Sequence, residues 1–179
     1  KYRTIIADDE EPARDRLKKL LAVYSNKIEI VGEAKNGNQC KDLIIALKPD
    51  LIFLDVQMPG LNGIESTKVI KKISPFVKVI FLTAYNQFDY AHEAIKLGVE
   101  EFIIKPATND RFLQVIRSTI EDMKAEREQN ELHEKMEMKL QKVSKYLENE
   151  FVMALVTGDI DVEQTKEYLD FHGINAQCA

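Results

Sequence analysis

The segment LIFLDVQMPGLNG, Leu51–Gly63, contains the signals that decide the fold. Its first five residues are apolar except for the last, Asp55, which is typical of a strand buried on both faces. Pro59 and Gly60 follow as breakers of regular structure. A buried strand that ends on a carboxylate raises the question of what the charge does there.

Four further runs have the length and apolar content of strands, and helical patterns with one apolar face separate them. The expected strands are Tyr2–Ala7, Ile28–Ala34, Leu51–Asp55, Val77–Leu82 and Glu101–Ile104. The expected helices are Pro12–Tyr24, Gln39–Leu47, Ile64–Ile73, Phe88–Leu97 and a fifth that begins near Asn109. Such strict alternation predicts an α/β fold, in which helices cover both faces of a doubly wound, five-stranded parallel sheet.

The carboxyl ends of parallel strands meet at one edge of a sheet, and ligands of such folds collect there. Asp8 and Asp9 follow the first expected strand, and Asp55 ends the third. Thr83 and Lys105 directly follow the fourth and fifth. We therefore expect three carboxylates, a hydroxyl and an ammonium group to converge at this edge.

The composition narrows the possible functions. The chain has 179 residues, of which 45% are hydrophobic and 31% charged, and its formal net charge is −5. That charge argues against nucleic-acid binding through the chain's own electrostatics. There is no apolar run of about 20 residues, no secretory signal and no metal-type spacing between Cys40 and Cys178. We expect a cytoplasmic protein without membrane contact.

The converging residues predict a specific chemistry. Three carboxylates form an oxygen-rich site that suits a hard cation such as Mg²⁺. Asp55 is then the best-placed nucleophile toward phosphorus. Lys105 and Thr83 would contact phosphoryl oxygens, because phosphoryl transfer depends mainly on positioning and charge neutralisation.

These residues resemble the receiver domain of two-component response regulators. The resemblance covers residues 1–122 and rests on the motifs ADDE (Ala7–Glu10), LIFLDVQMPGLNG, FLTAY (Phe81–Tyr85) and IIKP (Ile103–Pro106). It implies a flavodoxin-like (βα)5 fold and a sensor histidine kinase that donates a phosphoryl group to Asp55. Such a domain is a phosphoacceptor switch that catalyses only its own phosphorylation and dephosphorylation, rather than an enzyme.

The resemblance also assigns roles to single residues. Asp8, Asp9, Asp55 and the backbone carbonyl of Gln57 would hold Mg²⁺. The bond between Lys105 and Pro106 would be cis.

A switch pair is implied as well, consisting of Thr83 and Phe102. Thr83 would move toward the phosphoryl group and Phe102 would rotate inward. Gln57 and Tyr85 border the path of hydrolytic water in similar receivers. We expect a bulky Tyr85 to slow autodephosphorylation.

The residues after the receiver favour a long helix. Residues 123–157 read as a helical linker with a polar start, followed by apolar residues whose spacing drifts from a heptad. Residues 158–179 read as the start of a further helical segment, with a short helix at Val162–His172. The apolar positions are Leu132, Met136, Leu140, Val143, Leu147 and Phe151.

The linker leaves a short coiled coil possible, and its apolar stripe would be buried against a partner copy or against the chain's own following helix. We expect a homodimer, formed through the linker or through the face between the fourth and fifth helices.

The sequence is compatible with more than one output domain. AYNQFDYAHEAIKLGVEEFIIKP and FVMALVTGDIDVEQTKEYLDFHGI are similar to regulators that carry a helical linker and an AraC-type DNA-binding domain. DNA would then be bound only by a C-terminal domain outside this sequence. DDEEPARDRLKKLL instead resembles regulators with a LytTR-type output.

Two other classes of protein share part of this pattern of residues. A haloacid-dehalogenase-like phosphatase needs a second acid two residues after the nucleophile, where this chain has Gln57. A binding module without phosphorylation would leave the acidic set without a purpose.

Overall fold

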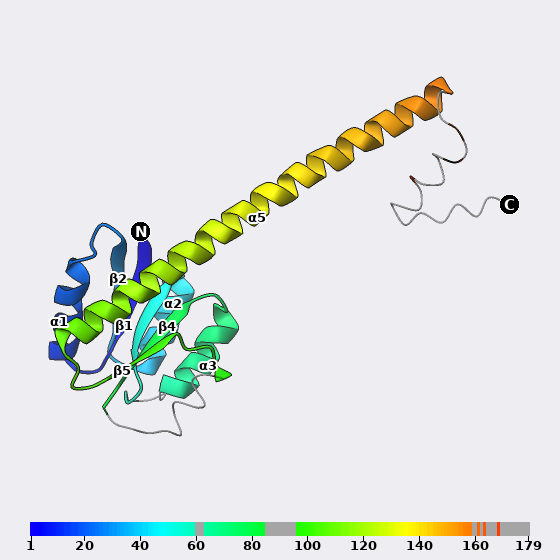
Figure 1. Ribbon diagram of the computed structural model, residues 1–179. Coiled ribbons are helices and arrows are strands. Elements are labelled where there is room, and N and C mark those ends of the chain that lie inside the picture. The colour runs from blue at the N-terminus through cyan, green and yellow to red at the C-terminus, as the bar shows by residue number, and fades with distance from the viewer. Residues whose placement is uncertain (60–62, 85–95, 159–160, 162, 164–167, 169–179) are drawn as a thin grey trace. The chain divides into compact units, whose positions relative to one another are not determined.

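The computed structural model describes residues 1–59, 63–84, 96–158, 161, 163 and 168 (Figure 1). Five parallel strands form one sheet in the order β2-β1-β3-β4-β5, which confirms the predicted fold class. The strands are β1 (Tyr2–Ala7), β2 (Ile28–Ala34), β3 (Leu51–Asp55), β4 (Lys78–Thr83) and β5 (Glu101–Ile104). The helices are α1 (Glu11–Ala22), α2 (Gly37–Leu47), α3 (Gly63–Ile73) and α5 (Asn109–Thr157).

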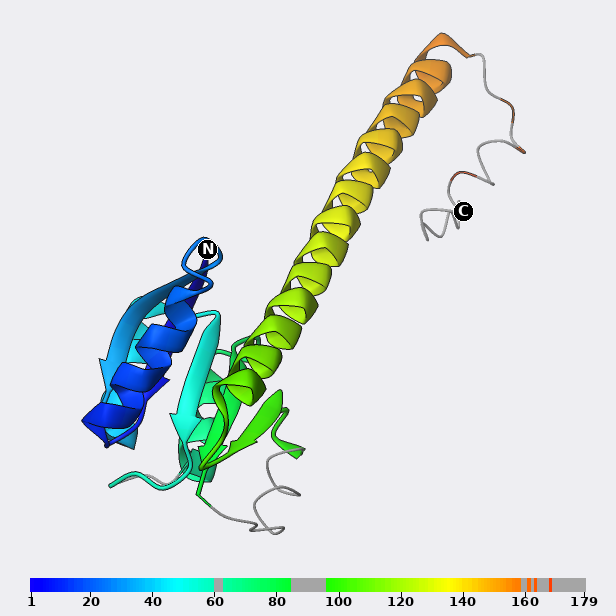
Figure 2. The same ribbon diagram turned by 60° about the vertical axis from the view of Figure 1, so that its left-hand side comes forward.

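Alternating side chains of each strand point into two separate cores, as the period of two in a strand requires. On one face, Ile52 and Leu54 of β3 pack with buried residues of α2 and α3. On the other face, Leu51 and Phe53 pack with α1 and the first turns of α5. Figures 1 and 2 show these helices on the two sides of the sheet. Strand β3 is therefore central and buried along its whole length.

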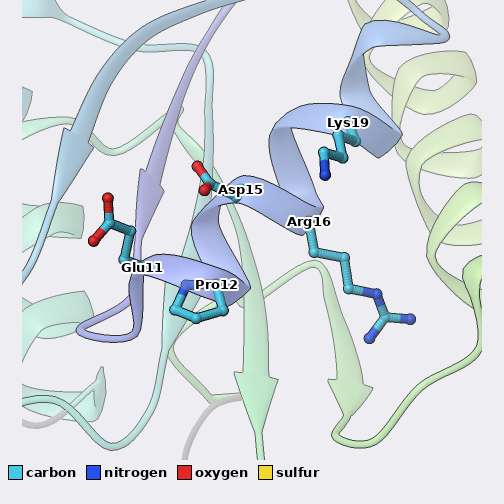
Figure 3. Close-up of a pocket in the computed structure, with 5 residues that line it drawn as sticks. All are labelled: Glu11, Pro12, Asp15, Arg16 and Lys19. Carbon is cyan, nitrogen blue, oxygen red and sulfur yellow. The ribbon is translucent and has the colours of Figure 1, made fainter.

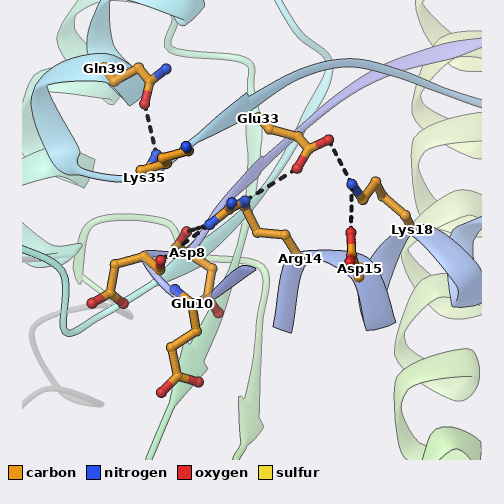
Figure 4. Close-up of polar contacts among 9 residues, drawn as sticks. Asp8, Glu10, Arg14, Asp15, Lys18, Glu33, Lys35 and Gln39 are labelled. Carbon is orange, nitrogen blue, oxygen red and sulfur yellow. Dashed lines mark hydrogen bonds and ion pairs between the residues drawn. The ribbon is translucent and has the colours of Figure 1, made fainter. Parts of the chain in front are cut away.

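Helix α2 begins at Gly37, two residues before the predicted start at Gln39. The side chain of Asn36 caps it, because Asn36 Oδ1 accepts a hydrogen bond of 2.8 Å from the Gln39 N–H. In return, Gln39 Oε1 accepts one of 2.9 Å from the Lys35 N–H (Figure 4). The helix therefore begins two residues earlier than the apolar pattern indicates, because the polar cap sets its first residue.

Other boundaries shift by one or two residues. Helix α1 ends at Ala22 rather than at Tyr24. The N–H groups of Val23 and Tyr24 bond to carbonyls three residues earlier, so the last turn is tighter than an α-helix. Strand β4 lies one residue later than predicted, at Lys78–Thr83. The predicted helix Phe88–Leu97 lies mostly outside the described residues, as does the predicted helix Val162–His172.

Helix α5 continues without a break to Thr157 and is followed by Gly158, whose φ of 75° is readily available only to glycine. Contacts divide the chain into unit 1, Lys1–Met123, and unit 2, Lys124–Ala179. The boundary falls inside α5. Among the described residues, no helix is long and apolar enough to cross a membrane.

Candidate functional site

The carboxyl ends of three strands bring Asp8, Asp55 and Lys105 into direct contact. The Lys105 ammonium group donates a hydrogen bond of 2.6 Å to Asp8 Oδ2 and one of 2.7 Å to Asp55 Oδ2. The backbone N–H of Lys105 donates to the carbonyl of Thr83 at 2.6 Å, which holds the end of β5 beside the end of β4. Lys105 therefore contacts Asp8 after β1, Asp55 at the end of β3 and Thr83 at the end of β4.

Local turns orient the two carboxylates. The Glu10 N–H donates to Asp8 Oδ1 at 3.0 Å, and the Gln57 N–H donates to Asp55 Oδ1 at 2.9 Å. In both turns a side chain accepts from the backbone two residues later, a pattern that Asp favours. Asp8 is 0% exposed and Asp55 is 7% exposed. One oxygen of each carboxylate is thus held by the backbone and the other by Lys105.

Asp9 completes a cluster of three carboxylates. One carboxylate oxygen from each of Asp8, Asp9 and Asp55 lies within 4.8 Å of the other two. Asp8 and Asp55 are buried, whereas Asp9 is exposed. Three hard oxygen donors at this separation fit a divalent cation that prefers oxygen ligands.

Burial and hydrogen bonding shift the pKa values of Asp55 and Lys105 in opposite directions. Burial raises the pKa of Asp55, and the hydrogen bonds from Lys105 and from the Gln57 N–H offset that rise only in part. Burial acts to lower the pKa of Lys105, but its hydrogen bonds to Asp55 and Asp8 outweigh burial and raise the pKa overall. Lys105 therefore stays protonated and stabilises the two carboxylates.

The structure describes four of the other predicted site residues, namely Gln57, Thr83, Phe102 and Pro106. Thr83 ends β4 and is half-buried, and Gln57 is exposed in the loop after β3. Phe102 of β5 is half-buried, and its ring meets that of Phe81 edge to face at a centroid distance of 5.7 Å. The peptide bond between Lys105 and Pro106 is cis. Tyr85 lies outside the described residues.

Arg14 is a buried residue of the site region that the sequence reasoning missed. It is 4% exposed, and its Nη1 donates to the carbonyls of Asp8 at 2.8 Å and Asp9 at 3.2 Å. Its Nε donates to Glu33 Oε2 at 3.2 Å, and Lys18 approaches the other oxygen of Glu33 at 3.0 Å (Figure 4). Arg14 thus ties the acidic loop to β2.

A signal for Arg14 was present in the sequence. Position 14 lies three and seven residues before Leu17 and Leu21, on the apolar face of α1. An arginine on the buried face of an amphipathic helix must have hydrogen-bond partners nearby, because a buried charge is costly without them. An arginine at position 14 therefore indicates that hydrogen-bond partners lie beneath the buried face of α1.

A surface pocket of about 480 Å³ lies along α1, and none of Asp8, Asp9 and Asp55 lines it (Figure 3). The residues that line it are Glu11, Pro12, Asp15, Arg16 and Lys19. Arg16 donates to the carbonyl of Ala107 at 2.5 Å and its guanidinium lies 5.0 Å from the centre of the Phe112 ring. This side chain therefore ties α1 to the start of α5, and the pocket contains no cluster of carboxylates like that at the strand ends.

Comparison with known proteins identifies the family. The model of the response regulator receiver domain matches residues 4–117, so the chain belongs to this family. The receiver (REC) domain of AraT, a response regulator from Geobacillus stearothermophilus, is similar in structure with a TM-score of 0.66 and 29% identity. That match covers 70% of this chain and 98% of the AraT domain. Family membership favours a receiver over a haloacid-dehalogenase-like phosphatase.

Two curated relatives differ in how far the similarity extends. The uncharacterized transcriptional regulatory protein YesN of Bacillus subtilis is 29% identical over 161 residues, which is 88% of this chain. The sensory transduction protein LytT of Bacillus anthracis is 35% identical over 115 residues, which is 64% of this chain. The chain spans only 43% of YesN and 46% of LytT.

Proposed function

We propose that this chain is a phosphorylation switch of a two-component system and that Asp55 is its phosphoacceptor. The observation that carries the proposal is the contact of Lys105 with both Asp8 and Asp55 inside the carboxylate cluster. A nucleophilic carboxylate, two further acids and a fixed ammonium group are the parts that phosphoryl transfer to an aspartate needs. A sensor histidine kinase is the expected donor.

In the proposed reaction an oxygen of Asp55 attacks the phosphorus of a phosphohistidine. The bond between phosphorus and the imidazole nitrogen breaks, and its electron pair stays on the imidazole. Lys105 contacts one oxygen of the transferred group, and the Thr83 hydroxyl donates a hydrogen bond to another. Both groups lie at the ends of neighbouring strands, where transition-state charge can be stabilised without large rearrangement.

Mg²⁺ is the proposed cofactor. The donors that would hold it are the carboxylates of Asp8, Asp9 and Asp55 and the backbone carbonyl of Gln57. When bound, the ion neutralises negative charge on the carboxylates and on the phosphoryl group. Because burial raises the pKa of Asp55, a neighbouring cation also favours the ionised form that acts as the nucleophile.

Phosphorylation is proposed to act through Thr83 and Phe102. Movement of Thr83 toward the phosphoryl group would open space at the end of β4. The half-buried Phe102, which already packs against the Phe81 ring, would then turn further inward. A two-state surface around β5 would carry the signal.

Regulation of transcription is the proposed output, with DNA bound by a domain outside this sequence. Similarity to YesN extends through most of unit 2, whereas similarity to LytT covers a length close to that of the receiver alone. This difference favours a YesN-like output over a LytTR-type one.

Labelling of the chain with a small radioactive phosphodonor tests the proposal. We expect Mg²⁺-dependent incorporation of one phosphoryl group, which is lost in Asp55→Asn and with excess chelator. Asp42→Asn is the matched control, because Asp42 is an exposed aspartate of α2. Equal labelling of both variants would refute Asp55 as the acceptor, and multiple turnover would indicate a phosphatase.

The lifetime of the phosphoryl group is tested separately. Tyr85→Ala should release phosphate faster than the unchanged chain, if Tyr85 obstructs water. Gln57→Ala provides a comparison at the other proposed position. An unchanged rate for Tyr85→Ala would contradict the role of this side chain.

A further inference from the structure

The part of α5 in unit 2 carries a stripe of large apolar side chains that lie in solvent. The described structure leaves them between 46% and 68% exposed. Such a continuous stripe rarely stays uncovered, because burying it releases ordered water at little structural cost. The exposed members are Leu132, Met136, Leu140, Val143 and Leu147.

Phe151, at the end of the same stripe, has a partner within the chain. Its ring stacks on that of Tyr168 at a centroid distance of 3.7 Å and an interplanar angle of 7°. The surface that remains for a second molecule is therefore Leu132–Leu147, which we call the seam.

The spacing along the stripe is four, four and three residues, repeated. Leu132 and Val143 are eleven residues apart, and so are Met136 and Leu147. Eleven residues in three turns give about 3.67 residues per turn, slightly more than the 3.6 of a straight α-helix. Two such helices can stay in contact along the seam with almost no supercoiling, or with a slight right-handed one.

The edges of the seam carry opposite charges at its centre. At about 98° per residue for an eleven-residue repeat, Glu137 and Glu148 fall on one edge. Lys135 and Lys139 fall on the other edge, which continues beyond the seam with Glu150, so the charges are opposite only within the seam itself. Contacts within the helix join residues of the acidic edge, with His133 Nε2 at 3.3 Å from Glu137 and the Ser144 hydroxyl donating to Glu148 at 3.4 Å.

Charge complementarity selects one partner and one direction. In a parallel pair, each edge of one helix faces the opposite edge of its partner, so Lys135 faces the partner's Glu137. In an antiparallel pair, like edges meet, and the acidic edges would repel each other. The seam therefore fits a second copy of itself that runs in the same direction.

We propose that a second copy of this chain packs on Leu132–Leu147 as a parallel, in-register coiled coil with an eleven-residue repeat. Pairing through unit 2 does not depend on phosphorylation of Asp55, and it goes beyond the proposed switch. It also places the two Gly158 residues at the same end of the pair.

Disulfide trapping in the full chain tests direction and register. Cys178→Ser serves as the background, since Cys40 is buried and burial raises the pKa of its thiol to about 12. Under mild oxidation, Met136→Cys, Leu140→Cys and Leu147→Cys should each give covalent dimers, because identical seam positions meet in a parallel pair. Lys145→Cys, on the opposite face, is the control and should give none. Dimers at one seam position or at none would overturn the proposal.

Sedimentation equilibrium tests whether the seam drives association. Leu140→Glu should raise the dissociation constant by about tenfold or more, because it buries a charge in the seam. Lys145→Glu should leave it unchanged. A monomer at all concentrations, with and without a phosphoryl mimic, would refute pairing.

Charge reversal distinguishes the two directions a second time. Glu137→Lys should weaken a parallel pair, and adding Lys135→Glu should restore it. An antiparallel pair would instead become tighter with Glu137→Lys alone, since that change removes repulsion between like edges.

Discussion

Helix α5 belongs to both units, and its apolar residues have opposite environments in the two. In unit 1, Phe112, Ile116 and Ile120 are 0–4% exposed. In unit 2, Leu132 and Leu140 are 64% and 68% exposed. The same helical periodicity therefore marks a face that the sheet covers in one unit and a face that stays exposed in the other.

Polar contacts differ between the units in the same way. In unit 1, Lys105 joins Asp8 and Asp55 at the partly buried edge of the sheet. In unit 2, the ion pair of Arg127 with Glu131 links exposed neighbours on one helix at 3.5 Å. Burial increases the energetic effect of a charge, whereas solvent screens it. Substitutions in unit 1 should therefore have larger effects on stability.

The largest expected effect comes from truncating the buried part of α5. Ile116→Ala should lower the free energy of unfolding by about 2–5 kcal/mol, because it leaves a cavity against the sheet. Leu140→Ala, measured at concentrations where the chain is monomeric, should change it by less than about 0.5 kcal/mol. Urea denaturation of both variants measures the difference. Equal losses would show that the two parts of α5 are buried alike.

Removing the ammonium group from the site should have the next largest effect. Lys105→Ala leaves Asp8 buried beside Asp55 with no cation, so stability should fall by about 2–3 kcal/mol without Mg²⁺. Excess Mg²⁺ should restore more stability to this variant than to the unchanged chain. Lys41→Ala, an exposed lysine of α2, is the control. Thermal denaturation with and without Mg²⁺ decides the outcome, and identical behaviour of the two variants would contradict it.

Substitution of Arg14 should have a smaller effect on stability and should also weaken metal binding. Lysine cannot reproduce the planar fork that reaches both the acidic loop and Glu33. Arg14→Lys should therefore cost about 1–2 kcal/mol of stability and weaken Mg²⁺ binding about tenfold.

A Mg²⁺ titration of the Arg14→Lys variant provides the measurement. Arg111→Lys, which alters an exposed ion pair with Glu101, is the matched control. Unchanged Mg²⁺ affinity together with lower stability would limit Arg14 to a packing role.

The smallest effect is expected in unit 2. Glu131→Gln removes the partner of Arg127 and should cost only about 0.2–0.5 kcal/mol, with less effect at high salt. Glu33→Gln in unit 1 removes the negative charge that Arg14 and Lys18 share and leaves one acceptor oxygen in place of two, so it should cost more. Thermal melts followed by circular dichroism at low and high salt compare the two. A larger loss for Glu131→Gln would reverse the proposed contrast.

Much of the fold was predictable because periodicity is a local property. The apolar run that ends at Asp55 predicted a buried strand, and the alternation of strands and helices predicted the parallel sheet. The start of α2 was not predicted, because capping by Asn36 depends on hydrogen-bond geometry rather than on apolar spacing. The order of the strands in the sheet, with β1 between β2 and β3, depends on the packing of segments that are far apart in the sequence.

The candidate site was predictable to about the same extent as the fold. The expected strand ends predicted that Asp8, Asp55 and Lys105 meet at one edge of the sheet. The sequence could not show that one ammonium group contacts both carboxylates, since these residues are 97 and 50 positions apart from it. Arg14 was missed because its partners are backbone carbonyls, which carry no signature in the side-chain pattern.

The types of the strands and helices, and the charged residues at the ends of β1, β3 and β5, follow from the amino-acid sequence alone, because they depend on local periodicity. The sequence also determines the eleven-residue spacing of the seam in α5. Which apolar faces are covered, and how Lys105 and Arg14 contact the acidic loop, depend on the folded chain. The physical reason is that burial and charge contacts depend on surfaces that distant parts of the chain bring together.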